Sequence, residues 1–166
     1  MILHILTASA RPGLLPAWAA ELAEATKSGV DLRWHVAFDL DRKYIGGQAV
    51  KNRMLDSIPE SDPGWVWIGD DDNVLDVEML VALQEYDEQL VDAVVFAQRR
   101  GSKVAAACAL VDRVDAAQFV GRRQFIGAHR IPTTYNGDGH WIAGMAKRGR
   151  VVFDDRVLTR YNGRTC

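Results

Sequence analysis

The chain has 166 residues, of which 48% are hydrophobic and 25% are charged, the ordinary balance of a globular domain. Twenty basic and 22 acidic residues give a net charge of −2, which excludes a strongly basic nucleic-acid binder that works by neutralising phosphates. A chain of this length buries enough surface to fold around one core, so we expect one domain over residues 1–166.

The cysteines and the hydropathy of the chain exclude further classes of protein. Cys108 and Cys166 are too few for a disulfide framework or a metal cage. The N-terminal residues show no basic leader before a long apolar stretch, and no window approaches the roughly 18 apolar residues of a membrane-spanning helix. We therefore expect a soluble, cytoplasmic protein with no membrane span.

Apolar runs and helical repeats alternate along the first hundred residues. Strands are predicted at 2–6, 32–38, 65–68 and 93–97. Between them lie a helix from residue 15 to the stop at Ser28–Gly29, a helix marked by Val50, Met54 and Leu55 after the break at Gly46–Gly47, and a helix capped by Asp76 with Val77, Leu80 and Val81 in its apolar stripe. The alternation predicts a Rossmann-like α/β domain with a mostly parallel central sheet and helices on both faces.

The last third of the chain is more mixed. Short strands are predicted at 104–110 and 117–120. A helix is predicted at 138–147, with Trp141, Ile142 and Met145 on its inward side.

Three aspartates, Asp70, Asp71 and Asp72, directly follow the predicted strand 65–68. In an open parallel sheet, ligands bind where the carboxyl ends of the strands meet the loops. Adjacent carboxylates repel one another unless a cation or hydrogen-bond donors compensate, and such oxygen ligands suit Mg²⁺ or Mn²⁺ shared with substrate phosphates. The alternative is a solvated turn whose side chains only cap the next helix.

Asp138 lies between two glycines at the start of the predicted helix 138–147. The helix dipole favours the ionised carboxylate there, and we expect Gly137 and Gly139 to let a substrate approach closely, so Asp138 is a candidate general base. The alternative is a capping aspartate whose glycines serve the turn.

The order of these motifs resembles glycosyltransferases of the GT-A fold, especially the family 2 type. The resemblance covers nearly the whole chain and rests on Thr7–Pro12, Phe38–Asp39, Gly46–Arg53, Val66–Asp72, Phe119–Arg123, Gly137–Gly139 and Val157–Asn162. It implies a metal-dependent inverting enzyme that moves a sugar from a nucleoside-diphosphate sugar to an acceptor hydroxyl. Residues 1–100 would bind the nucleotide sugar, and residues 101–166 would hold the acceptor and the base.

The resemblance also implies roles for particular residues. Asp70 and Asp72 would form a D-x-D motif that holds Mn²⁺ or Mg²⁺, Asp70 and Asp71 would contact the nucleotide sugar, and Asp138 would be the catalytic base. The base and ribose of the nucleotide would lie near Thr7, Ala8, Arg11 and Asp39, and Lys51 would approach the base or the diphosphate.

Two departures from the family pattern concern the acceptor and the metal. The chain is shorter than most relatives, so its acceptor site is either small or completed by a second copy or another subunit. No histidine follows His140 to serve as a third metal ligand, which leaves Asp154, Asp155 or water. The acceptor itself stays open among saccharide, lipid, protein and nucleic-acid base.

Other readings of the sequence stay open beside this one. Asp39-Leu40-Asp41 and Gly69-Asp70 resemble motifs of haloacid-dehalogenase-type phosphatases, although their spacing is unfavourable. A catalytically silent nucleotide-sugar-binding subunit is a third class. Four arginines, Arg113, Arg122, Arg123 and Arg130, form either a basic rim for a phosphate-bearing acceptor or ordinary solvated surface.

Overall fold

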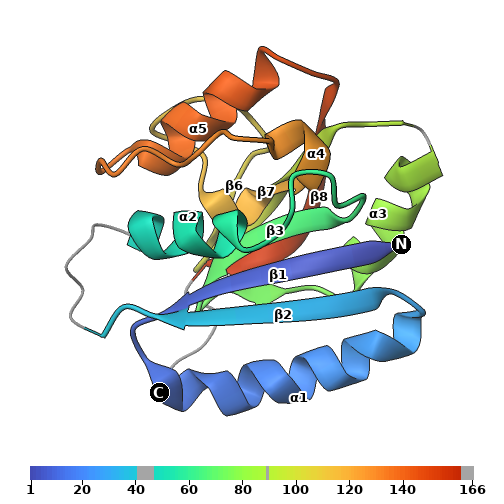
Figure 1. The fold of residues 1–166 in the computed structure, drawn as a ribbon, viewed down its shortest axis with the longest axis vertical. Coiled ribbons are helices and arrows are strands. Elements are labelled where there is room, and N and C mark those ends of the chain that lie inside the picture. The colour runs from blue at the N-terminus through green and yellow to red at the C-terminus, as the bar shows by residue number, and fades with distance from the viewer. Residues whose placement is uncertain (41–46, 89, 162–166) are drawn as a thin grey trace.

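The computed structural model describes residues 1–40, 47–88 and 90–161. Our sequence-based interpretations also involve Asp41, Gly46, Asn162 and Cys166, which lie outside the described residues. The described chain forms one sheet with helices on both of its faces (Figure 1).

The described sheet has eight strands. They are β1 (Ile2–Ser9), β2 (Asp31–Phe38), β3 (Trp65–Asp70), β4 (Val74–Leu75), β5 (Ala93–Arg100), β6 (Lys103–Ala105), β7 (Phe119–Arg122) and β8 (Val151–Tyr161). Their order is β2-β1-β3-β7-β5-β8-β4, with β6 paired to β5. Strand β1 is parallel to β2 and β3, and β5 is parallel to β8, whereas β7 is antiparallel to both β3 and β5.

The prediction of a mostly parallel sheet is therefore wrong, because the sheet is mixed. Strand β7 enters between β3 and β5 in the reverse direction, and β4 and β6 are antiparallel to their partners β8 and β5. The α/β class and the helices on both faces are confirmed. The alternation of strand and helix that supported the prediction ends near residue 100, and the strands that break the parallel pattern are short or follow that point.

Helices pack on the two faces of the sheet as separate layers. They are α1 (Leu15–Ala25), α2 (Gln48–Asp56), α3 (Glu78–Glu88), α4 (Arg123–Ile126) and α5 (Gly137–Ala146), with single 3-10 turns η1 (Pro12–Leu14), η2 (Thr26–Ser28) and η4 (Ala116–Gln118). Helices α1 and α3 share one buried cluster with the sheet, and α2, α4 and α5 share the other. Among the described residues, no helix combines the length and the apolar character that crossing a bilayer requires.

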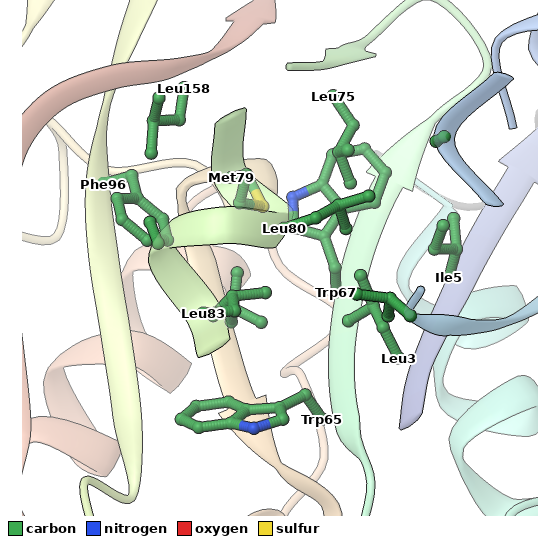
Figure 2. Close-up of a cluster of buried hydrophobic side chains, with 14 of the residues drawn as sticks. Leu3, Ile5, Trp65, Trp67, Leu75, Met79, Leu80, Leu83, Phe96 and Leu158 are labelled. Carbon is green, nitrogen blue, oxygen red and sulfur yellow. The ribbon is translucent and has the colours of Figure 1, made fainter. Parts of the chain in front are cut away.

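The cluster beneath α1 and α3 is rich in large side chains. Figure 2 shows Trp67 and Leu3 of the sheet close to Leu80 of α3, and Trp65 beyond Leu83. All five side chains are buried, so burial of apolar surface, worth roughly 25 cal/mol per Å², anchors α3 to the sheet.

Several predicted elements differ from the structure in detail. The apolar stripe predicted for α3 is wrong in part, since Val77 and Val81 are 47% and 54% exposed while Leu80 is buried. The helix starts after Val77, and its inward face is formed by Met79, Leu80 and Leu83. The strand predicted at 104–110 shrinks to β6, and β4 and β8 were not predicted. Helix α5 does bury the three residues predicted for it, Trp141, Ile142 and Met145.

Candidate functional site

Strands β1, β2 and β3 end at the same edge of the sheet. In their parallel registers Ala8 lies beside Asp70, and Ser9 lies beside Phe38. The loops that carry Arg11 and Asp39 therefore leave the sheet next to the acidic turn, by which we mean Asp70–Asn73. The acidic turn is closed by Asn73, whose backbone N–H donates to the Asp70 carbonyl at 3.1 Å and whose Oδ1 accepts from the Asp70 backbone N–H at 2.7 Å.

Asp71 fastens the acidic turn to the loop after β1. Its buried carboxylate accepts bonds from the Ser9 hydroxyl at 3.1 Å and from the Arg11 backbone N–H at 2.5 Å through Oδ2, and from Arg11 Nε and Nη2 at 3.1 and 2.7 Å through Oδ1. The Arg11 guanidinium also lies 2.5 Å from Asp72 Oδ2. Burial acts to lower the pKa of Arg11, but the hydrogen bonds and charges of Asp72 and Asp71 raise it overall. One arginine thus neutralises two of the three aspartates.

Lys51 neutralises the third aspartate from inside the protein. Helix α2 begins after Gly47, whose φ of +67° suits glycine, and one turn later the fully buried Lys51 places Nζ 3.0 Å from Asp70 Oδ1. Burial acts against its charge, but the carboxylates of Asp70, Asp138 and Asp115 outweigh burial and raise its pKa. Lys51 is therefore a buried cation that faces carboxylates from three separate segments of the chain.

The same surroundings affect the carboxylate of Asp70. Burial raises the pKa of Asp70 to about 6, the Lys51 ammonium opposes this shift, and the charges of Asp115 and Asp138 add to it. Its side chain keeps 32% of its surface exposed, so it remains accessible to a ligand.

Asp138 lies in the first turn of α5, is partly buried, and its charge acts on Lys51. Burial raises its pKa, Lys51 and the backbone N–H of Ala116 lower it in part, and Asp115 raises it further. Within the described chain its Oδ1 has no hydrogen-bond partner, and neither does the buried Nε1 of Trp141 one turn later. Buried polar atoms without partners are rare in proteins, so the unpaired Oδ1 is one reason to consider Asp138 a candidate functional residue.

The glycines on either side of Asp138 serve the packing of the chain. A Cβ at Gly137 would lie 1.9 Å from the carbonyl oxygen of Pro132, and one at Gly139 would lie 1.8 Å from that of Val111. We expected these glycines to leave room for a substrate, but the protein's own backbone occupies that space. The close approach fixes the N-terminus of α5, and so the position of Asp138, against two loops.

The remaining residues predicted for the nucleotide lie at or behind the same edge. Thr7 is buried and its hydroxyl accepts a bond from Trp34 Nε1 at 3.0 Å. Ala8 is also buried. Asp39 is partly buried, and its backbone N–H donates to the Ser9 carbonyl at 2.9 Å. Sequence reasoning missed Asp115, whose capping box with Gln118 is visible as a D-x-x-Q pattern.

The described residues contain no group of three His, Cys, Asp or Glu side chains that could hold a metal ion. Asp154, one candidate third ligand, instead bonds Tyr86 at 3.0 Å and Arg156 at 2.7 Å. Asp70 and Asp72 each contact their cation through one oxygen. An Mg²⁺ or Mn²⁺ ion held by these two side chains would have to take most of its ligands from phosphate oxygens and water, because the described residues form no closed all-protein site.

Three of the four arginines predicted as a basic rim are structural. Arg122 contacts Asp87 at 3.0 Å and stacks on Trp65, the buried Arg123 donates to the carbonyls of Leu55, Ile58 and Gly127, and Arg130 contacts Asp56 at 2.6 Å. These side chains tie loops together, which does not favour the basic rim, one of the two alternatives left open by the sequence. Arg113, the fourth, lines a cavity beside the β5–β6 hairpin.

Comparisons with known proteins give the fold and no family. No family model and no curated protein matches the chain. A197 from STIV is 11% identical with a TM-score of 0.59, over 98% of this chain and 83% of that one. A proposed glucose-1-phosphate thymidylyltransferase from Bacillus anthracis, solved in complex with a sucrose, is 11% identical with a TM-score of 0.51, over 96% and 89%. At this identity the likeness shows a shared α/β fold with a mixed sheet and nothing finer.

Proposed function

We propose that this protein is a metal-dependent inverting glycosyltransferase that takes its sugar from a nucleoside diphosphate and gives it to an acceptor hydroxyl. The observation that carries the proposal is the position of Lys51, which contacts Asp70 of the acidic turn and lies in the field of Asp138 from the far part of the chain. A donor-binding turn and a candidate base thus meet around one buried cation.

The donor would bind at the edge where β1, β2 and β3 end. Arg11 and Lys51 supply positive charge beside the acidic turn, which suits a diphosphate. Asp70 and Asp72 would hold Mn²⁺ or Mg²⁺, which when bound neutralises charge on the departing diphosphate. Thr7, Ala8, Asp39 and Asp71 remain our proposal for the nucleotide side. The fold shared with a protein named for a sugar-phosphate nucleotide reaction is consistent with such a donor.

Asp138 would act on the acceptor. Its carboxylate takes the hydroxyl proton while the acceptor oxygen forms a bond to the anomeric carbon from the face opposite the leaving group. The bond from that carbon to the diphosphate oxygen breaks, and its electron pair stays with the diphosphate. Burial makes the Asp138 carboxylate more basic than an exposed one, as its raised pKa shows.

A thermal-shift screen of UDP, GDP, dTDP, CDP and ADP and their glucose derivatives, with and without Mn²⁺, tests the donor site. A bound nucleotide raises the unfolding midpoint by mass action. We expect one nucleotide to give a shift that grows with Mn²⁺ in the native protein and loses its Mn²⁺ dependence in Asp72→Ala. The exposed Asp31→Ala is the matched control and should behave like the native protein.

Three outcomes would contradict the proposal. An Asp72→Ala variant with unchanged Mn²⁺-dependent binding would remove the D-x-D assignment. Hydrolysis of p-nitrophenyl phosphate without nucleotide binding would favour the phosphatase. Tight donor binding without release of nucleoside diphosphate, over a panel of sugars, lipids and peptides as acceptors, would favour the silent binding subunit.

A further inference from the structure

A cavity lies close to the first turn of α5, which carries Asp138. It has a volume of about 850 Å³ and lies between the β5–β6 hairpin and the loop that leads to η4. A hydrogen bond connects it to the proposed site, because Asp112, in its lining, accepts a 2.7 Å bond from Asn136, two residues before Asp138.

The lining of the cavity also packs against the first turn of α5, which carries Asp138. Val111 lies between the lining residues Leu110 and Asp112, and a Cβ at Gly139 would lie 1.8 Å from its carbonyl oxygen. The cavity therefore lies beside the N-terminal end of α5, where the proposed base is.

The lining of this cavity carries a net positive charge, whereas the whole protein is slightly negative. Arg100, Lys103 and Arg113 line it with one acid, Asp112, in a chain whose net charge is −2. Arg100 is held by Gln98 at 2.8 Å. Within the described chain, Lys103 and Arg113 have no ion pair, so their charges are available to a ligand.

Apolar side chains lie between these cations. Val104 and Leu110 line the same cavity and are 51% and 57% exposed, so they offer apolar surface next to the cations. Cations and exposed apolar surface in one cavity match a molecule that carries an anionic group on an apolar body. A neutral sugar or a fully polar polyanion would leave one half of the lining unused.

We infer that this cavity, lined by Arg100, Lys103, Val104, Leu110 and Arg113, binds the acceptor, and that the acceptor is an amphiphilic anion with a phosphate or carboxylate on an apolar body. The role of this molecule as the acceptor rests on the proposed function. Binding of such an anion to the cavity can be measured without any sugar transfer. The anionic group would contact Lys103 and Arg113, and the apolar body would cover Val104 and Leu110.

The test is titration calorimetry with hexyl phosphate, hexanoate and hexanol on the intact protein. We expect hexyl phosphate or hexanoate to bind about tenfold or more tightly than hexanol, and the stronger of the two identifies the anionic group. The double variant Lys103→Ala, Arg113→Ala should lose about tenfold in that affinity. Lys147→Ala, which removes an exposed cation near the end of α5, should lose nothing. Unchanged unfolding midpoints would show that the variants are folded.

The inference is overturned if neither anion binds better than hexanol, or if the double variant binds them as well as the native protein does. Nucleoside-diphosphate affinity, measured on the same preparations, separates this inference from the proposed function. If the anions do not bind in the cavity but nucleotides still bind, only the proposed class of acceptor is overturned. Anion binding that depends on Lys103 and Arg113 in a protein without nucleotide binding overturns the proposed function and leaves the anion site.

Discussion

Asp71→Asn tests whether the acidic turn is held in place by charge. The substitution keeps the size of the side chain but replaces one carboxylate oxygen with an NH₂ group. Both native oxygens accept bonds from N–H groups of Arg11, through the side chain at Oδ1 and through the backbone at Oδ2. The new NH₂ must therefore face a donor in either orientation of the amide.

The magnitude follows from burial and from the number of bonds. The Asp71 side chain is 2% exposed, so water cannot replace the lost acceptor. A hydrogen bond to a charged group contributes about 1.5–3 kcal/mol, and a buried donor left unpaired costs about 1–3 kcal/mol. Some loss overlaps between these two effects, so we expect the free energy of unfolding to fall by about 2–4 kcal/mol.

Urea denaturation measures this change, and Asp31→Asn is the matched control. Asp31 also pairs with an arginine, Arg33, at 2.9 Å, but its side chain is 55% exposed. An exposed pair contributes little, so the control should change the free energy of unfolding by less than about 0.5 kcal/mol with the same denaturant slope. Equal losses in the two variants would refute the idea that the buried Asp71 organises the turn.

The remaining predictions concern packing and pH. Gly139→Ala should destabilise the protein by about 1–3 kcal/mol or more in urea unfolding, because the new Cβ would meet a backbone carbonyl, while Gly144→Ala in the same helix has open space and should be neutral or stabilising. The pKa of Asp70, about 6, lies above its ordinary 3.8, so Asp70 contributes stability below about pH 4 that is lost as the pH rises through 6. Asp70→Asn should flatten that slope of unfolding free energy between pH 4 and 6, and an unchanged slope would contradict the raised pKa. Lys51→Met removes the cation that favours the Asp70 carboxylate, so NMR titration of Asp70 should show its pKa rising further, and a fall would contradict the contact.

The sequence predicted the positions of the candidate site residues on their elements better than it predicted the sheet partners. The acidic residues after β3 and Asp138 at the start of α5 were visible as local patterns, since each is set by the end of one element. Lys51 was named from a resemblance, but its complete burial depends on α5 and η4 packing against α2, which no local pattern shows. Its spacing of three and four residues from Met54 and Leu55 does place it on the buried face of α2.

The differences between the predicted and the observed strands have physical reasons. In β8 the charged run Asp154-Asp155-Arg156 interrupts the apolar alternation, and the pairing with β5 shifts register next to it, after Phe96 and after Ala97. A bulge of this kind breaks the period of two on which strand prediction depends. Strand β7 has only four residues, and its reverse direction is decided by its partners β3 and β5.

The central claim, that Asp138 is the base of a sugar transfer, is tested most directly by Asp138→Asn. Release of nucleoside diphosphate from the bound donor and the donor dissociation constant should be measured on one preparation, with the exposed Asp56→Asn as control. A positioned general base contributes roughly 10²–10⁴-fold, so release should fall by about that factor while the dissociation constant stays close to the native value. The control should retain native release. Near-native release by folded Asp138→Asn would contradict the assignment of Asp138 as the base.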